Sequence, residues 1–313
     1  MTNLSKYFLA ALLISTNAFA TTKTLEIVVP YPPGGTADKV AQAILPALRT
    51  ELTKENIVPV INYRPGAGSV TGIASVAKND HLQLVITSNS VITAPILNKM
   101  PNSYSLAEDL EVVSYLGRLP SVLVTSTTSG IKNFADLEQQ CRSNKFNYAS
   151  GGPGSVSHLG SALLFDKLNC NPIHVPYKGG GPMVTAVLGN HNPVGADFFG
   201  GVKALIDDGK LVPLLVLDRH RIDSLPGVPS LTDIGITEYQ LVNWFVIMSN
   251  RSGTPQQTSQ LNKAVTNAVN SPEVLTQLKA MGLKDVGAKK SRDFLVEEQQ
   301  TLIRILKTVK IND

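Results

Sequence analysis

The sequence predicts an α/β protein of two lobes, each lobe a sheet flanked by helices, with a ligand cleft between the lobes. Short β-branched runs alternate along the chain with helical segments that carry apolar residues on one side. This alternation is typical of sheets covered by helices on both faces. The chain has 313 residues, which is longer than a single hydrophobic core usually spans. Glycine-rich turns also follow two of the expected strands.

The N-terminus has the features of a secretory signal peptide over residues 1–20. One lysine, Lys6, precedes the apolar run Phe8–Ile14, and the small-x-small site Ala18–Ala20 follows. The alternative is a signal anchor, but such an anchor needs an apolar run of about 20 residues. The sequence therefore predicts cleavage after Ala20 and export from the cytoplasm.

Charge and aromatic content argue against a nucleic-acid partner. The chain carries 28 basic and 24 acidic residues in an interspersed pattern, and only 6% of its residues are aromatic. Nucleic-acid binding needs a basic stripe or stacking platforms, and the sequence offers neither. The five histidines occur singly, without the spacing of metal ligands. We therefore expect no nucleic acid, no metal and no cofactor.

The first βα unit begins with the strand Leu25–Val29. After the turn Pro32–Gly35, apolar residues recur at helical spacing. These are Val40, Ile44, Leu48 and Leu52. Further strands are expected at Val58–Ile61, Leu82–Ile86 and Phe146–Ala149, the last leading into a helix near Ser155.

Two apolar strands, Ser121–Thr125 and Gln240–Ile247, lie where one block of βα units gives way to another. We interpret them as the crossings between the lobes. Lobe 1 then comprises residues 21–118 and 244–313, and lobe 2 comprises 119–243. Three helices are expected to end the chain, and the first two open with proline, which the first turn of a helix tolerates. They span Pro255–Val269, Pro272–Met281 and Ser291–Lys310.

The two glycine-rich turns carry the strongest functional signal. In Pro30–Asp38, Thr36 can cap a helix, and in Tyr148–His158, Ser155 can do the same. Each turn would aim free backbone N–H groups and a positive helix end at one point, which suits an anion. Either turn alone could be an ordinary tight connection. Together they would face each other across a cleft at the carboxyl ends of strands.

Neither glycine-rich core contains an arginine or a lysine. The sequence therefore predicts that helix N-termini and neutral donors hold the anion, without a bidentate arginine. Arg64 and Arg118 lie in nearby turns, and we interpret both as residues that anchor loops.

Several blocks in one order along the mature chain resemble the Bug-type solute-binding proteins of tripartite tricarboxylate transporters. The resemblance covers essentially the whole mature chain. The blocks are Val28–Asp38, Arg64–Gly68, Leu116–Pro120, Tyr148–Leu159, Val175–Pro182 and Gly253–Pro255.

The resemblance implies a periplasmic-binding-protein fold of the Venus flytrap type II class, located in the periplasm. It also implies that backbone groups and water-mediated hydrogen bonds from both lobes hold a ligand carboxylate. Matched position by position, the ligand-binding residues are Tyr31, Pro33, Gly34, Gly35, Thr36, Ser88 and Asn89 in lobe 1, and Ser150, Gly151, Gly154, Ser155, His158 and Asp197 in lobe 2.

Asp197 matches a family aspartate at the end of a strand. There it could accept a ligand amine, hold a loop, or only cap the next helix. The chain departs from the family pattern beside it, because Pro193 stands where an aspartate is common and Phe198–Phe199 makes the corner apolar.

The resemblance implies a monomeric receptor that is not an enzyme and that delivers a small carboxylate to membrane permease subunits. The carboxylate could be a dicarboxylate, a tricarboxylate, an amino acid or an aromatic acid. One alternative is a sensor that reports to a sensor kinase. Another is a secreted hydrolase using Ser155, His158 and Asp38 or Asp197. The chain lacks the Gly-x-Ser-x-Gly elbow, which argues against the hydrolase.

The two cysteines predict a disulfide between Cys141 and Cys170. Each closes a helix that leads into a strand of lobe 2, and strands joined by one βα crossover tend to be neighbours. Their Cα atoms could then approach within about 7 Å, as a disulfide requires. The alternative is two free, buried thiols.

Overall fold

A computed structural model describes residues 23–142, 146–237, 243–288 and 292–308. The predicted signal peptide lies outside these residues. None of the helices in this part of the chain is long and apolar enough to cross a membrane.

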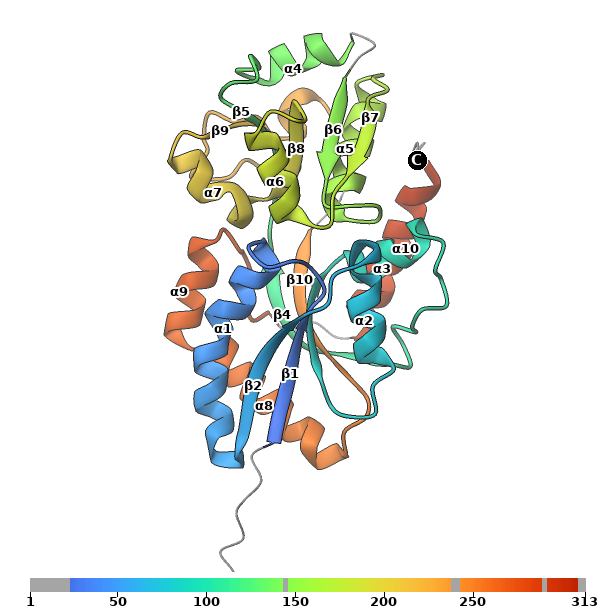
Figure 1. Cartoon of the computed structure of the whole chain (residues 1–313), viewed down its shortest axis with the longest axis vertical. Coiled ribbons are helices and arrows are strands. Elements are labelled where there is room, and N and C mark those ends of the chain that lie inside the picture. Colours follow the sequence, from blue (N-terminus) through green and yellow to red (C-terminus); the bar gives the residue numbers. More distant parts are fainter. Residues whose placement is uncertain (1–22, 143–145, 238–242, 289–291, 309–313) are drawn as a thin grey trace, which may run out of the picture.

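Two five-stranded sheets form two lobes, one above the other in Figure 1. The lower sheet has the strand order β2-β1-β3-β10-β4 and the upper sheet β7-β6-β8-β5-β9. This confirms the predicted fold class. The lower strands are β1 Lys23–Val29, β2 Ile57–Tyr63, β3 Leu84–Ser88, β4 Leu110–Arg118 and β10 Trp244–Asn250; the upper strands are β5 Ser121–Ser126, β6 Asn147–Ser150, β7 Ile173–Pro176, β8 Val194–Phe198 and β9 Leu211–Val216.

The sheets are mixed, although βα alternation alone predicts parallel ones. In lobe 1, β1 runs parallel to β2 and β3, but β10 is antiparallel to both β3 and β4. In lobe 2, β6 runs parallel to β7 and β8, but β5 is antiparallel to both β8 and β9. The antiparallel strands β5 and β10 are the segments placed at the crossings. Each enters its lobe from the other lobe, and therefore runs against the strands that the βα units build.

The strand predictions differ from the structure at several boundaries. The expected strand Leu82–Ile86 is observed as Leu84–Ser88, and Gln240–Ile247 is observed as Trp244–Asn250, with residues 238–242 outside the described part. The lobe limits at 118, 119, 243 and 244 stay a prediction. They are consistent with the sheets, because β4 and β10 belong to one sheet and β5 belongs to the other.

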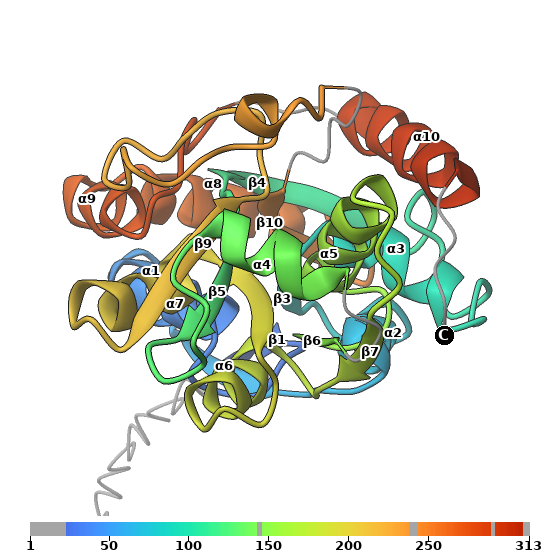
Figure 2. The same cartoon turned by 90° about the horizontal axis from the view of Figure 1, so that it is seen from above.

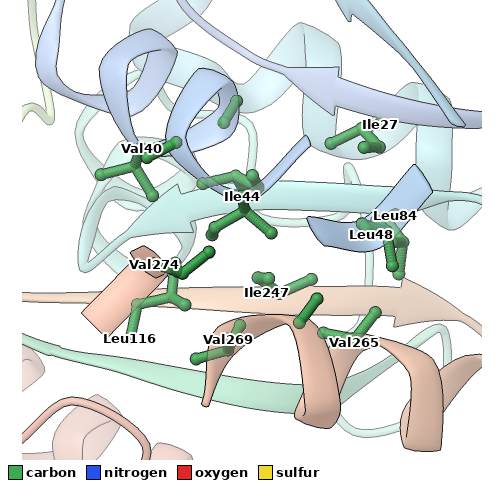
Figure 3. Close-up of a cluster of buried hydrophobic side chains, with 14 of the residues drawn as sticks. Ile27, Val40, Ile44, Leu48, Leu84, Leu116, Ile247, Val265, Val269 and Val274 are labelled. Atoms are coloured by element: carbon green, nitrogen blue, oxygen red, sulfur yellow. The ribbon is translucent and has the colours of Figure 1, made fainter. Parts of the chain in front are cut away.

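One face of the lobe 1 sheet packs against three helices, α1 (Thr36–Leu52), α8 (Pro255–Val269) and α9 (Pro272–Ala280). The predicted stripe on α1 is buried there. Figure 3 shows Val40, Ile44 and Leu48 of α1 pointing toward strand residues and α8. Spacing of four residues places these side chains one above another on one helix face, so the amphipathic pattern determines which side of α1 is buried.

The other face of that sheet packs against α2 (Val70–Ala77), α3 (Ser90–Leu97) and α10 (Arg292–Thr308). α10 lies beside α3 in Figure 1. Trp244, which is fully buried at the start of β10, donates from Nε1 to Glu298 Oε2 of α10 at 2.8 Å. The C-terminal helix is thereby fixed to the strand that returns from lobe 2.

Helices cover both faces of the lobe 2 sheet (Figure 2). α4 (Phe134–Cys141) and α5 (Val156–Lys167) bury one face, and α6 (Gly180–Leu188) and α7 (Phe199–Asp207) bury the other. Side chains at the start of α5 also join the lobe 1 cluster that contains Val91 and Trp244. Apolar side chains of the two lobes therefore pack against each other beside the cleft.

The predicted disulfide is confirmed. Cys141 ends α4 and Cys170 follows α5; their Sγ atoms are bonded and their Cα atoms lie 5.7 Å apart. β6 and β7, which the two cysteines precede, pair in parallel from Asn147 opposite Ile173. The bond therefore lies at the end of the sheet opposite the glycine-rich turns.

Candidate functional site

A cavity of about 50 Å³ lies between the lobes, at the carboxyl ends of β1, β3, β6 and β8. Its walls come from both sheets and from the turns that lead into helices. The lining residues are Tyr31, Pro32, Gly35, Thr36, Ala37, Ser88, Ser90, Ser121, Gly151, Ser155, Val156, Ser157, Gly179, Gly180, Asp197, Phe198 and Phe245.

Helix N-termini supply the polar side of the cavity. α1 begins at Thr36 after the N-cap Gly35, which has no side chain to cap the helix, so the prediction that Thr36 caps it is wrong. α5 begins after Ser155, whose Oγ accepts from the backbone N–H of His158 at 3.1 Å. α6 begins at Gly180, in the cavity wall. The first N–H groups of a helix have no partner within it, so three helix ends present donors and positive dipole ends here.

A cluster of hydroxyls forms the lobe 1 wall. Tyr31 Oη lies 3.3 Å from Ser88 Oγ and also bonds Ser90 Oγ. Ser90 Oγ lies 3.0 Å from Ser69 Oγ. A hydroxyl can both donate and accept a hydrogen bond, so this cluster can donate hydrogen bonds to an anion without a charged side chain.

Thr36 and Asp197 face the cavity with polar atoms that have few partners. Thr36 Oγ1 is buried, and no described residue forms a hydrogen bond with it. Asp197 accepts from the backbone N–H of Phe198 at 2.9 Å through Oδ1. Burial raises the pKa of Asp197 to about 6, although that hydrogen bond and Lys39 oppose the shift. Both residues are suited to contact a ligand.

The lobes are closed onto each other around the cavity. Thr93 Oγ1 of α3 donates to Gly154 O at 2.5 Å, and Asn98 Nδ2 donates to Pro153 O at 3.0 Å. On another side, Lys39 Nζ donates to Gly200 O at 3.1 Å. A Cβ added to Gly68 would lie 2.2 Å from Pro153 O, so the backbones meet without room for a side chain.

The residues matched to the family motif separate into two groups. Tyr31, Gly35, Thr36, Ser88, Gly151, Ser155 and Asp197 line the cavity. Pro33 and Gly34 are exposed at the tip of the first turn, where Gly34 N donates to Asp38 Oδ2 at 2.7 Å. Asn89 accepts from Trp244 N at 2.8 Å through Oδ1 and holds the start of β10.

Ser150, Gly154 and His158 lie behind the cavity wall. Ser150 Oγ is 2.6 Å from His174 Nε2 and accepts from Gly152 N at 3.0 Å. Gly154 N donates to His158 Nδ1 at 3.4 Å. These contacts shape the second glycine-rich turn from behind, and the residues do not line the cavity.

The contacts of His158 also bear on the hydrolase alternative. Its Nδ1 accepts from Gly154, and its buried Nε2 has no hydrogen-bond partner among the described residues. Neither ring nitrogen therefore bonds Ser155 Oγ, which instead caps α5. A serine nucleophile needs a base within hydrogen-bond reach, and this arrangement does not provide one.

Sequence reasoning missed several residues of the cavity. The turn between β7 and α6 contributes Gly179 and Gly180, and it has the same strand–glycine–helix form as the other two turns. That shared form could have identified it. Ser90, Ser121 and Phe245 also line the cavity without a signal in the sequence, whereas Ser157 lies within the second glycine-rich turn and Phe198 within the apolar corner.

The two arginines interpreted as anchors form ion pairs outside the cavity. Arg64 binds Glu26, and Arg118 Nε lies 2.7 Å from Asp285 Oδ2. The described residues that line the cavity include no arginine or lysine.

Comparison with known proteins gives one family. The family model described as "Tripartite tricarboxylate transporter family receptor" matches residues 31–310. Protein BugT of Bordetella pertussis is 30% identical over 285 residues, which cover 89% of this chain and 86% of that protein.

Solved structures share the fold. The periplasmic binding protein BugD superposes with a TM-score of 0.83 at 20% identity, covering 91% of this chain and 96% of that one. An R. palustris protein solved with adipate gives a TM-score of 0.80 at 24% identity, covering 92% and 98%. MatC from Rhodopseudomonas palustris with bound malate gives 0.80 at 22% identity, covering 93% and 100%.

Proposed function

Because the chain belongs to the tripartite tricarboxylate transporter receptor family, a family of periplasmic solute-binding receptors, we propose that it captures a small carboxylate between its lobes and passes it to membrane permease subunits. The protein works in the periplasm after removal of residues 1–20. It performs no chemistry on its ligand.

The observation that carries this proposal is the chemistry of the cavity wall. Helix N-termini and hydroxyls converge there from both lobes, and the described lining contains no basic side chain. Such donors suit a carboxylate, because they are already oriented toward the cavity and can hold the negative charge without a basic side chain. Closure around the ligand also removes it from water, which strengthens each hydrogen bond.

Within this proposal, the contacts differ between residues. Tyr31, Thr36, Ser88, Gly151 and Ser155 contact the ligand or its bridging waters. Pro33, Gly34, Asn89, Ser150, Gly154 and His158 act indirectly by holding the turns. Asp197 accepts a hydrogen bond from an amine or hydroxyl of the ligand.

The closed form presents a different surface from the open form. A ligand that stabilises the closed form therefore makes this surface available for a partner to recognise. Permease subunits and a sensor kinase could both use this difference. Deletion of the genes for such permease subunits should abolish ligand-dependent uptake if the protein serves transport. Loss of a transcriptional response with intact uptake would favour the sensor.

A binding experiment tests the proposal. Thermal shifts of the mature protein should be measured against dicarboxylates, tricarboxylates, amino acids and aromatic acids. A true ligand at 100 times its Kd adds about 2.7 kcal/mol to the free energy of unfolding. If none of these acids shifts the melting temperature, the proposal is wrong.

Thr36→Val provides a site-specific arm of this experiment. The substitution removes a buried hydroxyl without a partner, so the unliganded protein should keep its stability or gain some. Affinity for the ligand should fall about tenfold, the order of one lost hydrogen bond. Thr276→Val, on the exposed face of α9, is the matched control and should leave affinity unchanged.

A further inference from the structure

A cavity of about 400 Å³ lies between the lobes, on the other side of the crossing from the candidate ligand site. Pro120 and Phe199 line this cavity, whereas their chain neighbours Ser121 and Phe198 line the candidate site. Phe199 N donates to Pro120 O at 2.9 Å. Neighbouring residues of an extended chain point to opposite sides, so the segment that joins the lobes separates the two cavities. We call the cavity behind this segment the hinge cavity.

Both lobes contribute walls to the hinge cavity. Arg118 at the end of β4 and Lys279 in the last turn of α9 line it from lobe 1, and Lys203 of α7 and Arg221 beyond β9 line it from lobe 2. Figure 2 shows α9 and β4 toward one side of the molecule, and α6 and β7 toward the other. A ligand in the hinge cavity would therefore contact both lobes from behind the crossing.

Positive side chains outnumber negative ones in this wall. The described lining residues include two carboxylates, those of Asp218 and Asp223, against five lysines and arginines. Both lobes supply these cations, so the wall as a whole attracts anions. The basic residues are Arg118, Lys203, Arg221, Lys279 and Lys284.

The existing ion pairs of these residues leave donors for a ligand. Arg118 uses Nε for its carboxylate partner, and a guanidinium has five N–H donors. Lys279 forms no ion pair with a described residue. Exposed ion pairs contribute little energy, so an anion can take the place of a partner. Three of the basic residues pair with aspartates that do not line the cavity: Lys203 with Asp207, Arg221 with Asp233 and Arg118 with Asp285.

The C-terminal end of α9 also meets the hinge cavity. Gly282 N donates to Lys279 O at 2.9 Å, and Leu283 N donates to Leu278 O at 3.1 Å. Because these bonds satisfy carbonyls of the last turn, the negative end of the helix dipole acts less strongly on the cavity. Lys279 in the same turn adds a positive charge there.

We propose that the hinge cavity binds a multivalent oxyanion of the phosphate type, and that the bound anion favours the closed form of the cleft. Cations that come from two lobes suit an anion with several charged oxygens, since each oxygen can meet a different cation. A rotation about the crossing that opens the cleft on one side narrows the cavity on the other side. An anion that fills the hinge cavity therefore opposes opening.

Pyrophosphate is the probe for the site, because it carries several charges and no carboxylate. Isothermal titration calorimetry of the mature protein at low salt should show one pyrophosphate per chain, with a Kd below about 1 mM. The double variant Lys203→Gln/Lys279→Gln removes one cation from each lobe and should weaken pyrophosphate about tenfold. Lys210→Gln is the matched control and should leave the Kd unchanged, because this exposed lysine pairs with Asp208 outside the cavity.

The effect on closure is measured with the same probe. A Cβ on Gly68 would lie 2.2 Å from Pro153 O, so Gly68→Ala blocks the closed form at a site away from the hinge cavity. If the anion favours that form, Gly68→Ala should weaken pyrophosphate at least about fivefold. Gly209→Ala has similar backbone strain without the contact between lobes, and should bind pyrophosphate as the wild type does.

Three results would overturn the site: no binding to the wild type, equal affinity in the double lysine variant, or an equal loss in Thr36→Val, which would place pyrophosphate in the ligand cleft. Equal affinities of Gly68→Ala and Gly209→Ala would overturn the effect on closure. Because no carboxylate is used, these outcomes are separate from the thermal-shift test of the proposed function.

Discussion

The imidazole rings of His158 and His174 stack face to face, with centroids 3.9 Å apart and planes within 5° of parallel. His158 lies in the first turn of α5 and His174 in the edge strand β7. Tyr148 of β6 stacks on His174 at 5.0 Å. Burial and the neighbouring His174 lower the pKa of His158 to about 3.

The low pKa of His158 predicts a loss of stability in acid. The unfolded chain takes up this proton near pH 6.5, whereas the folded protein takes it up near pH 3. The contribution of neutral His158 to the free energy of unfolding is therefore fully present above pH 6.5. It is lost as the pH falls toward 3, by up to about 1.4 kcal/mol per pH unit. Urea unfolding from pH 7 to 4 should show a shallower pH slope for His158→Gln than for the wild type.

His81→Gln is the control for that slope, because the His81 side chain is 87% exposed. It should follow the wild type at each pH. Identical slopes for wild type and His158→Gln would show that His158 does not titrate differently on folding.

Asp197 predicts a pH effect of opposite sign. Its pKa rises from 3.8 to about 6 on folding, so its ionised form opposes folding above pH 6. Asp197→Asn keeps an acceptor for Phe198 N and removes the charge. The variant should gain at most about 3 kcal/mol at pH 7.5, and the gain should shrink below pH 6 and vanish below 4. Denaturant-induced unfolding measured across this pH range checks the predicted gain. Asp208→Asn, at an exposed position, is the control.

Gly68 and Gly209 allow closure to be tested apart from backbone strain. Both have positive φ, +63° and +65°, but a Cβ on Gly68 would meet Pro153 O of the other lobe, and a Cβ on Gly209 would meet nothing within 4 Å. Both alanine variants should lose about 1 kcal/mol of stability from strain. Only Gly68→Ala should also lower the affinity for the ligand, by tenfold or more, because the added methyl group blocks the closed form.

Titration calorimetry and small-angle scattering of both glycine variants, with and without ligand, measure this difference. Gly68→Ala should stay more extended in the presence of ligand. Equal ligand affinity in the two variants would contradict the role assigned to the Gly68–Pro153 contact.

The Cys141–Cys170 bond should stabilise lobe 2 without affecting the ligand. It closes a loop with a sequence separation of 29, which corresponds to roughly 3 to 4 kcal/mol in the chain-entropy model. A double Cys→Ser variant should therefore melt several degrees lower. Its ligand affinity should match the wild type, because the bond lies at the sheet end away from the cavity. An unchanged melting temperature, or two alkylated thiols in the native protein, would contradict this.

The sequence alone predicted the features that depend on local pattern. The spacing of Val40, Ile44 and Leu48 gave the buried face of α1, and Ser155 caps α5 as expected. Proline at the first turn correctly placed the starts of α8 and α9. These results follow from dihedral preference, side-chain spacing and capping, which act within a few residues of chain.

Only the tertiary structure decided the direction of β5 and β10 and the composition of the cavity wall. Ser90 and Ser121 come from different lobes, and Gly180 lies on the turn after β7, to which the sequence analysis assigned no ligand contact. His158 was expected at the ligand, but its ring packs on His174 behind the wall. Such placements depend on contacts between distant segments once two sheets close on each other, and no local pattern encodes which side chains then meet.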